Sequence, residues 1–129
     1  MPPRILIVDA SAGMRRTIRQ VVEDSTDLHV CGEGTDGQDG IRKAEQLKPD
    51  LVILDLTMPK MNGLQVARAI KKLLPKVCLV LFSLEENQLV RNAAKAAGIS
   101  AVASKREGSR SLFQGLRTAL QSADGVLFS

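Results

Sequence analysis

Four polar residues of complementary chemistry stand where short apolar runs of this sequence end: Asp9, Asp55, Ser83 and Lys105. A carboxylate can attack a phosphoryl group and form an acyl phosphate. Such a transfer uses a hard cation, usually Mg²⁺, that is held by carboxylates and keeps several waters. A hydroxyl can hydrogen-bond one phosphoryl oxygen, and an ammonium group can neutralise another. Each residue alone could equally cap a loop or carry surface charge, so the prediction of phosphoryl chemistry depends on the four being brought together.

The elements that must bring them together follow from the hydrophobic pattern. Apolar runs typical of buried strands alternate with segments of helical periodicity. The predicted strands are 4–8, 28–31, 51–54, 77–82 and 99–103, and the predicted helices follow Ser11 and Gly37 or span 63–74, 85–97 and 111–122. Ser11 is expected to be the N-cap of the first helix and Gly98 the C-cap of the fourth.

Strict alternation of this kind predicts an α/β fold with a parallel sheet and right-handed crossovers. We expect a flavodoxin-like (βα)₅ three-layer sandwich with strand order 2-1-3-4-5. Because the carboxyl ends of parallel strands open on one edge of the sheet, the four residues should meet there although they lie far apart in the sequence.

Composition limits the classes of function. The 129 residues are expected to form one domain, residues 1–129, with ordinary apolar and charged content. No apolar run approaches the length of a membrane span, the start does not resemble a signal peptide, and the two isolated cysteines give no metal or redox signal. We therefore predict a cytoplasmic protein without a membrane partner.

The charge is +4, but the basic residues are scattered over the predicted helices. They are interpreted mainly as solvated helix faces, with non-specific nucleic-acid contact as the minority interpretation. The sequence has three phenylalanines and neither Trp nor Tyr, so it offers no aromatic platform for stacking bases. Direct nucleic-acid binding by these residues is not expected.

Taken together, the motifs resemble the receiver domain of two-component response regulators. The resemblance covers essentially the whole chain and is carried by Ile5–Asp9, by Asp55 with Met58-Pro59 and Met61-Asn62-Gly63, by Ser83 and by Lys105. The end of the chain and the segment 101–105 are similar to receivers that precede a LuxR-type helix-turn-helix domain.

The resemblance implies a role for each residue. Asp55 is implied to accept the phosphoryl group from a histidine kinase or a small phosphodonor, and Asp9, Asp55 and the backbone carbonyl of Thr57 to hold Mg²⁺. Ser83 is implied to be the switch hydroxyl and Lys105 the lysine that pairs with the phosphate. Thr57 and Glu85 lie where the family tunes the lifetime of the acyl phosphate. The chain is thus expected to be a signalling domain and not an enzyme with turnover of its own.

Three positions depart from the family pattern. Ala10 stands where the family carries a second pocket acid, which predicts weak Mg²⁺ binding and slow phosphorylation. Val102 replaces the aromatic switch residue, so the usual coupling of Ser83 to the outer surface is absent or altered. Arg106 follows Lys105 in place of proline, and since a non-proline cis bond costs ~3 kcal/mol, the Lys105–Arg106 peptide is predicted to be trans.

These departures keep an alternative open, a pseudo-receiver that works by phosphorylation-independent protein–protein contact. A phosphatase of the haloacid dehalogenase type is disfavoured because Asp55-Leu56-Thr57 lacks the second acid of a DxD pattern. A flavin-binding flavodoxin is disfavoured because no hydroxyl-rich phosphate loop follows the first strand.

The expected partners are a histidine kinase or a phosphotransfer protein on the input side. On the output side we expect a protein partner, or a C-terminal DNA-binding domain that lies outside these 129 residues. Homodimerisation through the outer helices stays open at this point.

Overall fold

A computed structural model of the chain describes residues 2–25 and 27–121. Its elements, in chain order, are β1 (Arg4–Val8), α1 (Ala12–Glu23), β2 (His29–Gly34), α2 (Gly37–Leu47), β3 (Leu51–Leu54), α3 (Gly63–Leu73), β4 (Cys78–Ser83), α4 (Gln88–Ala96), β5 (Ala101–Ser104) and α5 (Ser109–Gln121). All strand pairs are parallel and the order in the sheet is β2-β1-β3-β4-β5. The predicted flavodoxin-like (βα)₅ fold is therefore confirmed.

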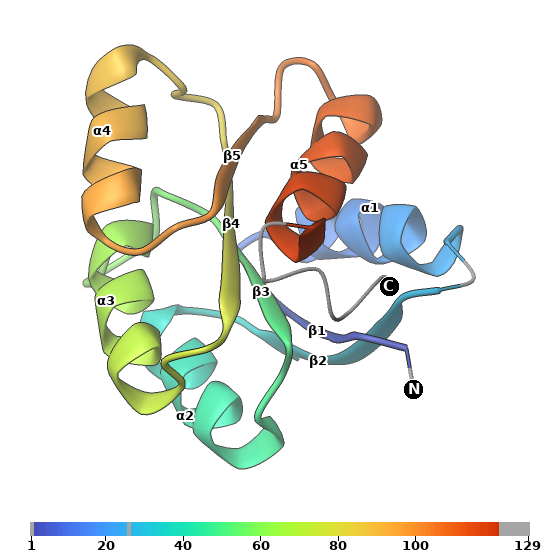
Figure 1. The fold of residues 1–129 in the computed structure, drawn as a ribbon, viewed down its shortest axis with the longest axis horizontal. Coiled ribbons are helices and arrows are strands. Elements are labelled where there is room, and N and C mark those ends of the chain that lie inside the picture. The colour runs from blue at the N-terminus through green and yellow to red at the C-terminus, as the bar shows by residue number, and fades with distance from the viewer. Residues whose placement is uncertain (1, 26, 122–129) are drawn as a thin grey trace.

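The helices form two layers, one on each face of the sheet (Figure 1). Successive side chains of a strand point to opposite faces, so Ile5 and Ile7 of β1 belong to the core under α1 and α5, whereas Leu6 and Val8 belong to the core under α2, α3 and α4. β3 and β4 are buried along their whole length. This burial on both faces explains why their sequences are unbroken apolar runs.

Most differences from the predicted elements concern helix ends. Ser11 caps α1 as predicted, because its side chain accepts a hydrogen bond from the Met14 backbone N–H. By contrast, α4 begins three residues later than predicted, with Asn87 as its N-cap. Ala97 is the C-cap of α4, and Gly98 follows it with a φ of 86° that suits glycine.

β2 is longer than predicted and runs to Gly34, because its pairing with β1 continues to the end of that strand. β5 begins two residues later than predicted, at Ala101. The apolar tail 123–129, which contributed to the resemblance to LuxR-type receivers, lies outside the described residues. Within the described part of the chain, no helix is both long and apolar enough to cross a membrane.

Candidate functional site

Three of the predicted residues meet directly at the carboxyl edge of the sheet. The Lys105 ammonium lies 3.0 Å from Asp9 Oδ2 and 3.0 Å from Asp55 Oδ1. All three side chains are largely buried, with exposed fractions of 10% for Lys105, 2% for Asp9 and 13% for Asp55. The site is thus a pocket in which one cation bridges two carboxylates.

Backbone pairing of the strands holds each of these residues in place. The Asp9 N–H donates to the Gly34 carbonyl, the Asp55 N–H to the Val8 carbonyl and the Lys105 N–H to the Ser83 carbonyl, at 2.8 to 3.1 Å. The sheet ladder therefore continues one residue beyond β1, β3 and β5. Since the ladder determines where each Cα lies, the pocket is built on the hydrogen-bonded ends of three strands.

The environment makes Asp55 a more basic carboxylate than an ordinary aspartate. Burial raises its pKa and the nearby charge of Asp9 raises it further, while hydrogen bonds from the Lys105 side chain and the Thr57 backbone act in the opposite direction. The net direction is upward. A more basic carboxylate at the mouth of a pocket is chemically apt as a nucleophile.

Asp9 is held from two sides. Its Oδ1 accepts a hydrogen bond of 2.8 Å from the Ser11 backbone N–H. Its backbone carbonyl accepts one of 2.6 Å from Arg15 Nη1, and Arg15 is itself paired with Glu33 at 3.0 Å. The contacts of Arg15 with Asp9 and Glu33 were not predicted from the sequence, because no local pattern relates Arg15 to a residue in the second strand. Ala10, between these anchors, is exposed and carries no side-chain donor or acceptor.

Ser83 and Thr57 lie at the same edge of the sheet. Among the described residues, neither side chain makes a hydrogen bond to Asp9, Asp55 or Lys105. Ser83 is buried, and its Oγ accepts a hydrogen bond of 3.0 Å from the Glu85 backbone N–H. This is a local turn that serine side chains commonly make. The Thr57 side chain is exposed, and Thr57 meets the pocket through its backbone.

Gly63 is a positioning residue that the sequence reading interpreted only as part of a turn and helix start. Its N–H donates to the Leu56 carbonyl at 2.8 Å. A Cβ at this position would lie 3.0 Å from the Asp55 carbonyl carbon and 3.1 Å from Leu56 Cα, and nearer still to the Asp55 carbonyl oxygen. The start of α3 therefore packs directly against the backbone of Asp55. The capping box formed by Asn62 and Gln65 fixes that helix start.

The pocket offers oxygen donors of the kind that Mg²⁺ prefers. Within residues 2–25 and 27–121, no group of three or more Asp, Glu, His or Cys side chains could hold a metal. The pocket instead offers two carboxylates, Asp9 and Asp55, and the carbonyl of Thr57 close by in the chain. Mg²⁺ is commonly held by one or two carboxylates and keeps several waters. The oxygen donors thus fit the ion, with Lys105 as a competing cation between the carboxylates.

The two other departures predicted from the sequence are visible at the same edge. The Lys105–Arg106 peptide is trans, as predicted, and Arg106 is exposed. Val102 lies in β5 and is only partly buried, so an aliphatic side chain occupies the position of the expected ring.

Comparison with known proteins identifies the family. The model of the response regulator receiver domain matches residues 5–117, which run from the second residue of β1 into α5 and contain the whole pocket. The chain belongs to the response regulator receiver family. It is therefore a receiver domain of two-component signalling, as the motifs indicated.

The receiver is similar to parts of longer proteins with different outputs. It is 38% identical over 105 residues to protein-glutamate methylesterase/protein-glutamine glutaminase 3 of Geobacter sulfurreducens, an alignment that covers 81% of this chain and 28% of that protein. It is 38% identical over 93 residues to the response regulator protein VraR of Staphylococcus saprophyticus, covering 70% of this chain and 44% of that protein. The receiver thus spans less than half the length of these relatives.

Solved structures of receivers have the same fold as this chain. The response regulator domain of Thermotoga maritima CheB aligns with a TM-score of 0.85 and 28% identity over 94% of this chain and 98% of that one. A LuxR-family two-component response regulator from Aurantimonas sp. aligns with a TM-score of 0.89 and 24% identity over 95% of this chain and 87% of that one. The latter likeness shows the fold alone.

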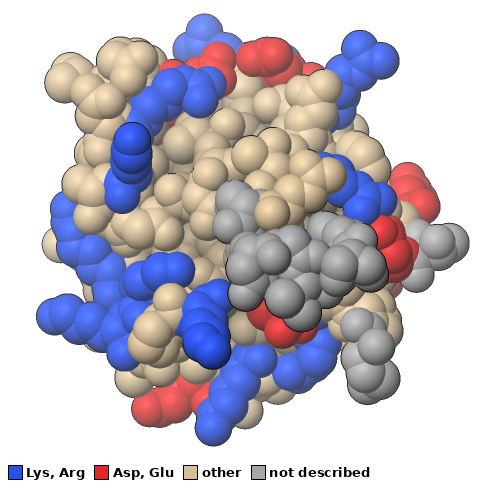
Figure 2. Space-filling model, in the orientation of Figure 1, with Lys and Arg blue, Asp and Glu red and all other residues tan. Residues whose placement is uncertain are grey.

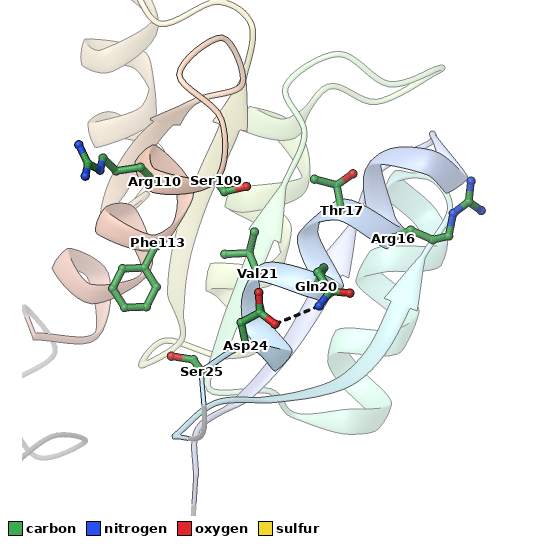
Figure 3. Close-up of a pocket in the computed structure, with 9 residues that line it drawn as sticks. All are labelled: Arg16, Thr17, Gln20, Val21, Asp24, Ser25, Ser109, Arg110 and Phe113. Carbon is green, nitrogen blue, oxygen red and sulfur yellow. Dashed lines mark hydrogen bonds between the residues drawn. The ribbon is translucent and has the colours of Figure 1, made fainter.

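The receiver also has an open groove between α1 and α5, of about 640 Å³. Figure 3 shows its lining residues, which include Val21 of α1 and Phe113 of α5, with Arg16 and Arg110 extending outward to opposite sides. One end of the groove lies close in the chain to the pocket, since Ser109 and Arg110 begin α5 just after Lys105.

Proposed function

We propose that this receiver accepts a phosphoryl group on Asp55 and relays the change to a protein-interaction surface. The observation that carries the proposal is the bridging of Asp55 and Asp9 by the Lys105 ammonium at 3.0 Å each. An Asp55 oxygen would attack phosphorus while the bond from phosphorus to the donor, P–N in a phosphohistidine, breaks. The electron pair of that bond leaves with the donor nitrogen, and an acyl phosphate results.

Each pocket residue has a role in the proposal. Lys105 would move a short distance from the carboxylates and pair with a phosphoryl oxygen. Asp9, Asp55 and the Thr57 carbonyl would hold Mg²⁺, which when bound neutralises phosphoryl oxygens. With Ala10 in place of a second acid, we expect this binding to be weak.

Ser83 would be the switch hydroxyl. Its Oγ accepts from the Glu85 N–H, so its O–H proton is free to donate to a phosphoryl oxygen. A shift of Ser83 toward the phosphoryl group would pull on the loop 84–87 that leads into α4. The response would then be a population shift on the surface formed by α4, β5 and α5, without the aromatic side chain that Val102 replaces.

We infer that a histidine kinase or phosphotransfer protein docks in the α1–α5 groove, because one end of that groove adjoins the Lys105 loop. The output would be a protein partner or a further domain. One relative is a methylesterase. One structural neighbour is a DNA-binding response regulator of the LuxR family from Staphylococcus aureus. Residues 1–129 are proposed to act as one receiver unit in the cytoplasm.

The second candidate is the pseudo-receiver, in which the same fold makes constitutive protein contacts. Ala10 and Val102 favour it, since they remove a metal ligand and the switch ring. The retained trio of Asp9, Asp55 and Lys105 favours phosphorylation, because a pocket without that task has no need of two carboxylates buried side by side.

The test is intact mass after incubation with phosphoramidate and Mg²⁺. One phosphate adduct on the wild type and none on Asp55→Asn is the expected result. If the wild type gains no adduct while its circular dichroism shows an intact fold, phosphorylation is contradicted and the pseudo-receiver is supported. An adduct that persists in Asp55→Asn would place the acceptor elsewhere.

A further inference from the structure

One arginine of α1 is largely removed from water. On the face that Figure 2 shows, Lys and Arg side chains extend outward around much of the outline of the molecule. The sequence predicts solvated helix faces for such residues. Arg15 is an exception, because only 14% of its side chain is exposed. A guanidinium group that loses its hydration needs acceptors that compensate for the loss.

The acceptors of Arg15 come from the ends of two neighbouring strands. Its Nη1 donates to the Asp9 carbonyl at 2.6 Å, and its Nε donates to Glu33 Oε1 at 3.0 Å. Because the donors of a guanidinium form a rigid fork, the contact with Glu33 sets the direction in which Nη1 points. Arg19, one turn further along α1, pairs with the other Glu33 oxygen at 2.7 Å. In the contacts of the described residues, only Arg15 of these two arginines reaches Asp9.

An irregularity in β2 turns Glu33 toward α1. The pairing of β2 with β1 skips Cys31, so that Cys31 and Gly32 both face the core under α2, α3 and α4. Glu33 consequently lies opposite Ile7 and faces the same side of the sheet, under α1. Without the extra residue, the alternation along the strand would turn Glu33 to the other face, away from Arg15. The bulge therefore makes the contact with Arg15 possible.

The end of β2 also holds the other side of the Asp9 backbone. The Asp9 N–H donates to the Gly34 carbonyl at 3.1 Å, directly after Glu33 in the chain. Arg15 holds the Asp9 carbonyl, and the Ser11 N–H donates to Asp9 Oδ1 at 2.8 Å. The N–H, the carbonyl and one carboxylate oxygen of Asp9 are thus each fixed by a separate partner. The second carboxylate oxygen is left to face Lys105.

The position of Asp9 has particular weight in this pocket, because Ala10 supplies no second acid. Lys105 lies 3.0 Å from Asp9 Oδ2 and 3.0 Å from Asp55 Oδ1. A shift of the Asp9 backbone would move its carboxylate relative to both. Groups that hold a metal ligand in place from behind commonly change metal affinity or activity by about 10–100-fold when they are removed.

We propose that Arg15, oriented by Glu33, is a positioning residue that fixes the Asp9 carboxylate opposite Asp55. If Arg15 only tied α1 to β2, its loss would lower the free energy of unfolding and leave the geometry of the pocket unchanged. The consequence for phosphoryl transfer rests on the proposed function, whereas the position of Asp9 can be measured without metal or phosphodonor.

The first test is the coupling free energy between Asp9 and Lys105. It is obtained in metal-free buffer from a double-mutant cycle of Asp9→Asn and Lys105→Met, by urea unfolding of the intact chain. The cycle is measured in the wild type and again in the Arg15→Met background. Arg15→Met should lose about half of the coupling, because a contact that opens from 3.0 Å to more than about 3.5 Å is no longer a hydrogen bond.

Arg19→Met is the matched control for this cycle. It removes the same type of side chain from the same helix and from the same partner, Glu33, but it does not contact Asp9. The coupling should stay at its wild-type value in this background. Glu33→Gln, which keeps an acceptor for Arg15 and removes the charge, should give a loss between those of Arg19→Met and Arg15→Met. This milder variant also serves if Arg15→Met does not fold.

The second test is calorimetric titration with Mg²⁺. Arg15→Met should bind the ion about tenfold more weakly than the wild type, and Arg19→Met within about twofold of it. Unchanged coupling in Arg15→Met and Glu33→Gln would overturn the proposal, as would equal losses of coupling in Arg15→Met and Arg19→Met. If the wild type takes up no Mg²⁺, the metal part of the proposed function fails, and the metal-free cycle alone decides whether Arg15 positions Asp9.

Discussion

Replacing Gly63 with alanine tests whether the start of α3 holds Asp55 in place. The added Cβ would stand 3.0 Å from the Asp55 carbonyl carbon and 3.1 Å from Leu56 Cα. Carbon atoms pack at about 3.5–4.0 Å, so helix and backbone must separate by roughly 0.5–1 Å. Neither side is a flexible side chain that could turn away.

The displacement should lower both stability and phosphorylation. Overpacking of this kind costs about 1–3 kcal/mol, and the better helix propensity of alanine offsets at most about 1 kcal/mol of it. We expect a net loss of roughly 1–2 kcal/mol in the free energy of unfolding. A nucleophile displaced by about 1 Å can lose about a hundredfold in rate.

Gly13→Ala is the matched control. Gly13 also lies in the first turn of a helix, but a Cβ there would have its nearest neighbours at an ordinary 3.8 Å. It should be neutral or stabilising by up to about 1 kcal/mol. The assays are urea unfolding followed by far-UV circular dichroism, since the chain has no Trp or Tyr, and the rate of adduct formation by mass. If Gly63→Ala matches Gly13→Ala in midpoint and the wild type in rate, α3 does not position Asp55.

Three further outcomes are expected. Ala10→Asp should raise Mg²⁺ affinity in calorimetric titration, because it restores a pocket carboxylate; no gain would contradict the assignment of Asp9 and Asp55 to the metal. Asp55→Asn should gain stability over the wild type as pH rises from the ordinary carboxyl range of about 4 toward the raised pKa of Asp55, because there the folded wild type binds more protons than the unfolded chain. A stability difference that is constant with pH would refute that direction. Asn62→Ala should cost about 0.5–2 kcal/mol through loss of the α3 N-cap yet leave Asp55 reactive, so a failure to phosphorylate at temperatures where the variant is folded would show that the cap does more than stabilise.

Prediction from sequence succeeded where local chemistry determines the structure. The strand Leu51–Leu54 is buried on both faces, and such a strand requires an unbroken run of apolar residues. The carboxylate that follows it then had to lie at the carboxyl edge of the sheet. The same reasoning applies to Asp9 and Lys105, so the sequence predicted that the three residues meet.

It failed at two helix starts, where a side-chain cap or a close backbone approach sets the position of the helix. Glu85 and Glu86 suit a helix, but the Ser83 side chain binds the Glu85 N–H and Asn87 caps the chain two residues later, so α4 starts late. Asn87 was a recognisable cap signal. The approach of Gly63 to the Asp55 backbone had no local signal beyond a glycine at a helix start, because its cause lies eight positions back in the chain.

The bridge made by Lys105 also has a consequence for folding of the chain. Its two partners lie 96 and 50 positions earlier, and β5, which delivers the lysine, is an edge strand that pairs only with β4. Because Lys105 directly follows β5, its ammonium can bridge Asp9 and Asp55 only when that edge strand has paired with β4. Contacts of such long separation form slowly. A chain truncated before β5 would therefore keep both carboxylates without the cation that bridges them.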